Sequence, residues 1–173
     1  FLRRLVEATR SLRTGPAEDP GTFVPPLIDE EARQKVRHYV DIAKSEGRVV
    51  LQMEEPAEGH FVGPVIVADV SPQAVLAQEE IFGPVLAVLK ARDFDEALAI
   101  AMSTPSALTG GLYSRSPAHI ERARQDLRVG NLYLNRKITG ALVGRQPFGG
   151  LGLSGTGSKA GGPDYLLQFM EPR

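Results

Sequence analysis

The order of secondary-structure elements is set most clearly by the stretch VLAVLKARDFDEALAIA, residues 85–101. Its first five residues form a near-continuous apolar run, which is typical of a buried strand. Asp93, with Glu96 three residues later, predicts a helix N-terminus with a capping box. Apolar side chains then recur at helical spacing. A buried strand that leads into a helix in this way is typical of an α/β fold.

The same order continues on both sides of this stretch. On the C-terminal side the sequence predicts a strand at Leu108–Tyr113, a helix beginning at Ser116-Pro117 and a strand at Gly130–Asn135. The elements predicted on the N-terminal side are a helix over residues 1–12, a helix capped by Asp29 and ended by Gly47, strands at Val49–Met53 and Phe61–Val67, and a helical turn after Ser71-Pro72. Three successive strand–helix–strand units predict an α/β domain with a largely parallel sheet flanked by helices.

Length and composition place the chain among ordinary globular proteins. Its 173 residues are enough for one domain with a real core. The hydrophobic share of 42% and the charged share of 24% are typical of soluble domains. A formal net charge of -1 gives no reason to expect nucleic acid or a membrane surface as a partner. No apolar run approaches the length needed to span a bilayer.

The sequence contains no cysteine, which excludes disulfides, thiolate metal sites and a cysteine nucleophile within these residues. The three histidines, His38, His60 and His119, are too far apart in the sequence to show metal-ligand spacing. We therefore interpret each of them as a surface or helix residue and expect no metal.

The segment QEEIFGP, residues 78–84, carries the first candidate binding site. In an extended segment the side chains at positions i and i+2 lie on one face, so Glu80 and Phe82 can face the same ligand. A carboxylate can accept two hydrogen bonds from a ribose diol, and an aromatic ring can pack on a flat heterocycle. The alternative is a surface Glu beside a core Phe that precedes a turn.

Further motifs follow at the C-terminal end. They are NLYLNR at residues 131–136, PFGG at 147–150 and SGTG at 154–157. Together with Glu-x-Phe-Gly-Pro, and in this order, they resemble the aldehyde dehydrogenase superfamily over essentially the whole chain. The loop NRKITGALVG at 135–144 and the segment GTGSKAGGP at 155–163 resemble its Δ1-pyrroline-5-carboxylate dehydrogenase branch, which includes the dehydrogenase half of bifunctional proline-utilisation proteins.

The resemblance implies a fold of the aldehyde dehydrogenase catalytic-domain type and roles for five residues. Glu80 would bind the nicotinamide ribose of NAD, and Phe82 would pack near the nicotinamide. The backbone amides of Gly140 and Ala141 would bind the α-carboxylate of the substrate, where the absence of a Cβ at the glycine lets the main chain approach an anion closely. Phe148 would form a wall for the aliphatic part of the aldehyde.

The resemblance also implies what these residues lack. The nucleophilic Cys, the general-base Glu, the oxyanion-stabilising Asn and the cofactor-binding domain of the family all lie upstream of what matches residue 1. We therefore expect residues 1–173 to be a partial catalytic domain, inactive by itself, of a longer protein that we call the parent. Glu54, Glu55 and Glu79 are expected to be solvated rather than to replace the missing base.

The reaction implied for the parent is the NAD-dependent oxidation of the small molecule L-glutamate γ-semialdehyde to L-glutamate in proline catabolism. The parent is expected to be a homo-oligomer in the cytoplasm, or in the mitochondrial matrix if it is eukaryotic. One alternative is an aldehyde dehydrogenase with another substrate. Another is a catalytically silent module that binds a ligand or a partner protein.

Two nucleotide-binding motifs are matched only superficially. GLGLSG at residues 150–155 fits the glycine spacing of a dinucleotide-binding fingerprint, but no strand is predicted before it and no helix after it. GLSGTGSK at 152–159 approaches a phosphate-binding loop. There, Ser158 displaces the lysine by one position, and Ala160 replaces the Ser or Thr that would bind magnesium. We therefore reject both interpretations.

Overall fold

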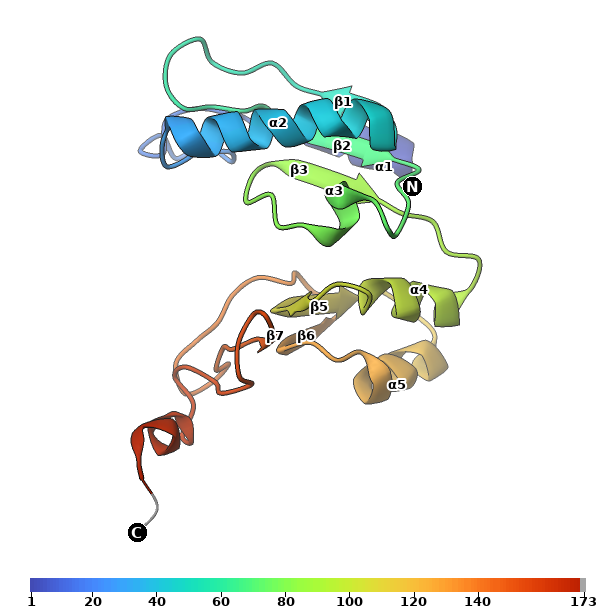
Figure 1. Cartoon of the computed structure of the whole chain (residues 1–173), viewed down its shortest axis with the longest axis vertical. Coiled ribbons are helices and arrows are strands. Elements are labelled where there is room, and N and C mark those ends of the chain that lie inside the picture. Colours follow the sequence, from blue (N-terminus) through green and yellow to red (C-terminus); the bar gives the residue numbers. More distant parts are fainter. Residues whose placement is uncertain (172–173) are drawn as a thin grey trace. The chain divides into compact units, whose positions relative to one another are not determined.

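The computed structural model describes residues 1–171, which form two compact units. The first unit comprises residues 1–90, and the second begins at Ala91. Both units combine helices with β-strands (Figure 1). The predicted α/β class is therefore confirmed. The assignment of all 173 residues to one partial domain remains a prediction.

The first unit is built on a three-stranded sheet. Its elements are α1 (Leu2–Arg10), α2 (Glu30–Glu46), β1 (Arg48–Gln52), β2 (Val65–Ala68), α3 (Val75–Gln78) and β3 (Val85–Val88). The strand order is β1-β2-β3, with β2 parallel to β3 and β1 antiparallel to β2. The parallel pair follows the prediction, because α3 provides the crossover that parallel strands need. Strand β1 is an antiparallel member of the sheet predicted to be largely parallel, because a loop without a helix joins β1 to β2.

Helix α2 forms where the sequence predicts a capped helix. The Asp29 side chain accepts a hydrogen bond of 2.8 Å from the backbone N–H of Ala32, and Gly47 follows the last helical residue. Glu30 and Glu31 lie in the first turn, where negative charge favours the helix dipole. The helix lies over the strands of its unit (Figure 1) and buries Val36, Tyr39, Val40 and Ala43 on one face.

The core of the first unit lies between α2 and the sheet. All four residues of β2 are buried, as expected for a central strand with a continuous apolar sequence. The predicted strand at Phe61–Val67 begins only at Val65 in the structure. The buried core cluster consists of Val36, Tyr39, Val40, Ala43, Val62, Val65, Val67, Val70, Leu76 and Ile81.

The second unit contains two short sheets. Its elements are α4 (Phe94–Ala101), β4 (Ser106–Ala107), β5 (Thr109–Leu112), α5 (Pro117–Asp126), β6 (Asn131–Leu134), β7 (Leu151–Gly152) and the 3-10 helix η1 (Tyr165–Phe169). Strands β5 and β6 are parallel with α5 between them, as predicted. The antiparallel pair of β4 and β7 was not predicted, because two-residue strands leave no periodic pattern in the sequence.

The start of α4 differs in one detail from the predicted capping box. The Asp93 side chain accepts a hydrogen bond of 2.8 Å from the Glu96 N–H, as predicted. The Glu96 carboxylate, however, accepts its backbone hydrogen bond from the N–H of Arg92 instead of that of Asp93. It also forms an ion pair with the Arg92 side chain. Of the helices within residues 1–171, none is long and apolar enough to cross a membrane.

We predict that Gly83→Ala destabilises the chain by about 1–3 kcal/mol, the usual cost of overpacking a core. A Cβ at Gly83 would lie 2.4 Å from Cγ2 of Val36, which is only 1% exposed. In a Val36→Ala background the obstructing methyl groups are gone, so the same change should cost much less. Denaturant unfolding of the wild type, the two single variants and the double variant measures the coupling between Gly83 and Val36. An equal cost of Gly83→Ala in both backgrounds would contradict the contact.

Candidate functional site

Glu80 and Phe82 both project from the first unit, on either side of a buried residue. Ile81 is only 8% exposed, whereas Phe82 is 82% exposed and Glu80 is also exposed. Within residues 1–171 the Glu80 carboxylate has no hydrogen-bond or ion-pair partner. The alternative of a core Phe is therefore wrong. The carboxylate and the ring are both available to a ligand, as the binding hypothesis requires.

The motif predicted an extended backbone at Phe82. The backbone there is instead left-handed, with φ of 60°. Residues with a bulky side chain rarely adopt this conformation, because their Cβ crowds the backbone. Such strain persists only where the surrounding structure imposes it, and it is concentrated at functional sites. The left-handed residue turns the chain into Gly83-Pro84 while it keeps the ring exposed.

Helix α2 holds this turn through three neighbouring side chains. Lys35 Nζ donates a hydrogen bond of 3.0 Å to the backbone carbonyl of Glu80, and the Tyr39 hydroxyl donates one of 2.6 Å to the Glu79 carboxylate. Val36, between them, packs against Gly83. The bond to Glu79, together with burial, raises the pKa of Tyr39 above its ordinary value.

Two expectations about this region change accordingly. Glu79 is exposed, but it is a hydrogen-bond acceptor and not simply solvated. Glu55 likewise forms an ion pair with Arg37. The sequence did not predict that Lys35 and Tyr39 hold this turn. Their partners lie 45 and 40 residues away in the sequence, so no local pattern joins them.

The loop between β6 and the Pro-Phe-Gly-Gly segment carries the second group of candidate residues. Gly140 has φ of 101°, a conformation that favours glycine. Apart from the two adjacent residues, the only atom within residues 1–171 that lies within 4 Å of an ideal Cβ there is Arg136 Nη2, at 4.0 Å. Gly140 and Ala141 are both exposed. Among the described residues, neither backbone N–H donates a hydrogen bond. Two successive N–H groups are thus free to bind an anion.

The rest of this loop is held by its neighbours. The hydroxyl of Tyr133, the buried residue of β6, donates a hydrogen bond of 2.9 Å to the Gly140 carbonyl. Arg136 is exposed, and its guanidinium lies 5.3 Å from the centre of the Tyr133 ring, within cation–π range. Leu142 and Gln146 close the loop with two backbone hydrogen bonds of 3.0 and 2.7 Å.

Phe148 is half-buried, and hydrogen bonds hold both its own backbone and the backbone of its two neighbours in the sequence. Two backbone hydrogen bonds of 3.0 and 2.8 Å join it to Ala160. The Asn131 side chain donates a hydrogen bond of 2.9 Å to the Pro147 carbonyl and accepts one of 3.3 Å from the Gly149 N–H. The sequence did not predict this role of Asn131. Its position at the start of a strand, where Asn is uncommon, was the available signal.

The predicted site residues therefore form two groups. Glu80 and Phe82 belong to the first unit, and Gly140, Ala141 and Phe148 belong to the second. Each group is held by contacts within its own unit. Within residues 1–171 no cluster of His, Asp and Glu could hold a metal ion. Residues 150–155, which match the dinucleotide fingerprint, form only strand β7 and a turn.

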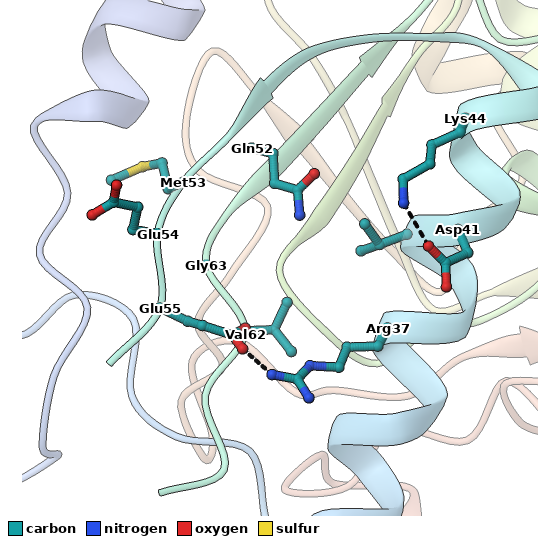
Figure 2. Close-up of a pocket in the computed structure, with 10 residues that line it drawn as sticks. Arg37, Asp41, Lys44, Gln52, Met53, Glu54, Glu55, Val62 and Gly63 are labelled. Carbon is teal, nitrogen blue, oxygen red and sulfur yellow. Dashed lines mark hydrogen bonds and ion pairs between the residues drawn. The ribbon is translucent and has the colours of Figure 1, made fainter. Parts of the chain in front are cut away.

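A polar hollow of about 510 Å³ lies beside α2 in the first unit (Figure 2). Its two basic side chains already have carboxylate partners in the wall: Arg37 pairs with Glu55, and Lys44 Nζ lies 2.6 Å from Asp41 Oδ1. The basic side chains are thus neutralised by neighbouring carboxylates. The lining residues are Arg37, Val40, Asp41, Lys44, Gln52, Met53, Glu54, Glu55, Val62 and Gly63. This hollow includes none of the predicted site residues.

Comparison with known proteins decides the family. The model of the aldehyde dehydrogenase family matches residues 1–173, the whole chain. The chain belongs to the aldehyde dehydrogenase family. Among curated members, the 1-pyrroline-5-carboxylate dehydrogenase of Bacillus subtilis (strain 168) is 52% identical over 99% of this chain and 34% of its own length. The chain thus spans about a third of the length of such relatives.

Solved aldehyde dehydrogenase structures share the fold. A 1-pyrroline-5-carboxylate dehydrogenase from Thermus with bound NAD has a TM-score of 0.94 and 50% identity, covering 98% of this chain and 33% of that one. Proline utilization A from Bdellovibrio bacteriovorus, inactivated by N-propargylglycine, has a TM-score of 0.96 and 50% identity. It matches 100% of this chain over 18% of its own. The expected aldehyde dehydrogenase fold is therefore confirmed.

The left-handed backbone of Phe82 leads to a prediction about stability. Glycine adopts this conformation freely, whereas alanine pays the Cβ penalty, so Phe82→Gly should be more stable than Phe82→Ala by about 1 kcal/mol. The exposed ring contributes little burial, and both variants should keep the fold. Denaturant unfolding monitored by circular dichroism measures the difference. Equal stabilities, or a more stable alanine variant, would contradict the strained turn.

Proposed function

We propose that the chain is the part of an NAD-dependent L-glutamate γ-semialdehyde dehydrogenase that binds the nicotinamide end of the cofactor and the carboxylate end of the substrate. The observation that carries the proposal is the pair of free backbone N–H groups at Gly140 and Ala141. The substrate has an α-carboxylate at the end opposite its aldehyde. Two adjacent donors on an exposed loop suit such an anion.

The residues around this pair support the same assignment. Gly140 keeps the approach to the amides open, because it has no side chain and its carbonyl is turned towards Tyr133. Phe148, fixed by Asn131 and Ala160, offers an apolar wall for the aliphatic part of the substrate. The names of the relatives from Bacillus and Thermus, which are 1-pyrroline-5-carboxylate dehydrogenases, also support the proposed substrate.

NAD, when bound, supplies the hydride acceptor for aldehyde oxidation. The groups of this chain that fit it are the unpaired Glu80 carboxylate, for the diol of a ribose, and the exposed Phe82 ring, for a flat heterocycle. The bound NAD of the Thermus relative supports this choice of cofactor. Since this sequence has no cysteine, the thiolate nucleophile would come from the parent outside these residues. From the family resemblance, the general base and the oxyanion-stabilising Asn would also come from there.

The same proposal includes the assembly and location of the parent. We propose a cytoplasmic homo-oligomer, or a mitochondrial one if the source is eukaryotic. The bacterial sources of the relatives, such as Bacillus subtilis and Thermus, support the cytoplasmic assignment. Size-exclusion chromatography with light scattering on the parent tests the oligomeric state.

We predict that Glu80→Gln in the parent weakens the hold on the nicotinamide ribose. The loss of a charged acceptor should cost about 1.5–3 kcal/mol and slow hydride transfer, without loss of the fold. Calorimetric NAD titration and single-turnover absorbance measure both effects.

Glu58→Gln is the matched control, because Glu58 is an exposed loop carboxylate outside the proposed site. Glu79→Gln is unsuitable, since Glu79 accepts the Tyr39 hydrogen bond. Unchanged hydride transfer in Glu80→Gln would show that this carboxylate is structural.

The substrate is tested by Gly140→Val. Valine at φ of 101° is strained and places a branched side chain beside the free N–H groups. We expect kcat/KM of the parent to fall at least tenfold more for L-glutamate γ-semialdehyde than for an uncharged aldehyde of similar length. Steady-state kinetics on both substrates measure the ratio. An equal loss on both would assign the loop a scaffold role and leave an aldehyde dehydrogenase with another substrate.

A further inference from the structure

Lys159, in the segment that only superficially matches a phosphate-binding loop, has an unusual set of partners. Its ammonium donates hydrogen bonds to the carbonyls of Gly130 and Gly149, the latter at 2.5 Å, and reaches Asn131 Oδ1 at 3.5 Å. An ammonium has three N–H donors, so these three oxygens match its capacity. None of the partners is a carboxylate.

Holding an ammonium group among neutral oxygens, partly withdrawn from water, costs free energy. The side chain is half-buried, and burial lowers the pKa of Lys159 below its ordinary value. A charge withdrawn from water usually pairs with an opposite charge. Here neutral oxygens alone replace the lost solvent. Lys44 and Lys90, by contrast, are exposed, and each pairs with a carboxylate.

The three oxygens belong to segments on either side of the loop at residues 135–146, which carries Gly140 and Ala141. Gly130 and Asn131 lie at the start of β6, and the loop leaves the other end of the same strand. Gly149 follows Phe148 directly. The backbones of Gly130 and Gly149 approach so closely that a Cβ on Gly130 would lie 2.1 Å from the Gly149 carbonyl oxygen. The ammonium binds both carbonyls at this point of convergence.

We propose that Lys159 is a positioning residue for substrate binding: it fastens the Phe148 segment to β6 and so fixes the far end of the 135–146 loop. Asn131 acts with it, because its side chain joins Pro147 and Gly149 to the same strand. Lys159 touches no substrate in this scheme and acts through Phe148 and through the free amides of Gly140 and Ala141. The inference rests on the proposed function and adds a residue to it.

The test uses Lys159→Met in the full-length parent, which keeps an unbranched side chain one heavy atom shorter and removes its donors. We expect its affinity for L-glutamate, measured calorimetrically without NAD, to fall at least tenfold. KM for the semialdehyde should rise more than kcat falls, and NAD affinity should stay within twofold. Hydrogen exchange of peptides covering residues 135–149 should accelerate. Lys44→Met is the matched control and should change none of these.

A purely structural lysine would lower the melting temperature without a selective loss of L-glutamate affinity. A folded Lys159→Met protein that binds L-glutamate as tightly as the wild type, or loses NAD and L-glutamate affinity equally, would overturn the inference. If Lys159→Met does not fold, Lys159→Arg decides. It keeps the charge but not the compact three-donor geometry, and it should show the same selective loss to a smaller extent. A wild-type parent that binds no L-glutamate would instead overturn the proposed function itself.

Discussion

Packing of one face of helix α2 against both the sheet and the turn at Gly83 is the constraint on which the first unit depends. Val36 is only 1% exposed and lies against Gly83, so a side chain on this glycine would force the Val36 side chain to move. Lys35 and Tyr39 add hydrogen bonds to the same turn. A strained residue such as Phe82 persists only where the surrounding contacts outweigh its cost. The α2 face supplies those contacts and leaves Glu80 and Phe82 exposed.

The second unit holds its candidate site by a different means. Its glycine-rich segment has few apolar side chains to bury, and several of those present, such as Leu153 and Leu166, are largely exposed. Polar contacts to the backbone replace a hydrophobic core there. Tyr133, Asn131 and Lys159 each bind a main-chain carbonyl of the loop or of the segment that follows it. Because such contacts are directional, they fix the orientation of amide groups as well as their position.

The contacts that hold the candidate residues in each unit agree with the proposed function. Binding groups must face a ligand, so they are exposed and have few internal contacts, whereas the residues behind them are buried or hydrogen-bonded. Glu80 and the amides of Gly140 and Ala141 are of the first kind, and Tyr39 and Tyr133 are of the second. Sites that are held by a supporting layer of this kind keep the geometry that binding requires. Under the proposed function, the chain would provide binding and positioning groups, and the nucleophile would lie elsewhere in the parent.

The sequence alone determined the features that depend on neighbouring residues: the caps at Asp29, Asp93 and Ser116, the alternation of strands and helices, and the motifs that identify the family. These signals are local, because a cap or a periodic face is encoded within a few residues. Only the tertiary structure decided the antiparallel direction of β1, the left-handed backbone of Phe82, and the partners of Glu79 and Lys159. Those features arise where segments distant in the sequence meet, and no spacing within the chain records which groups will face each other.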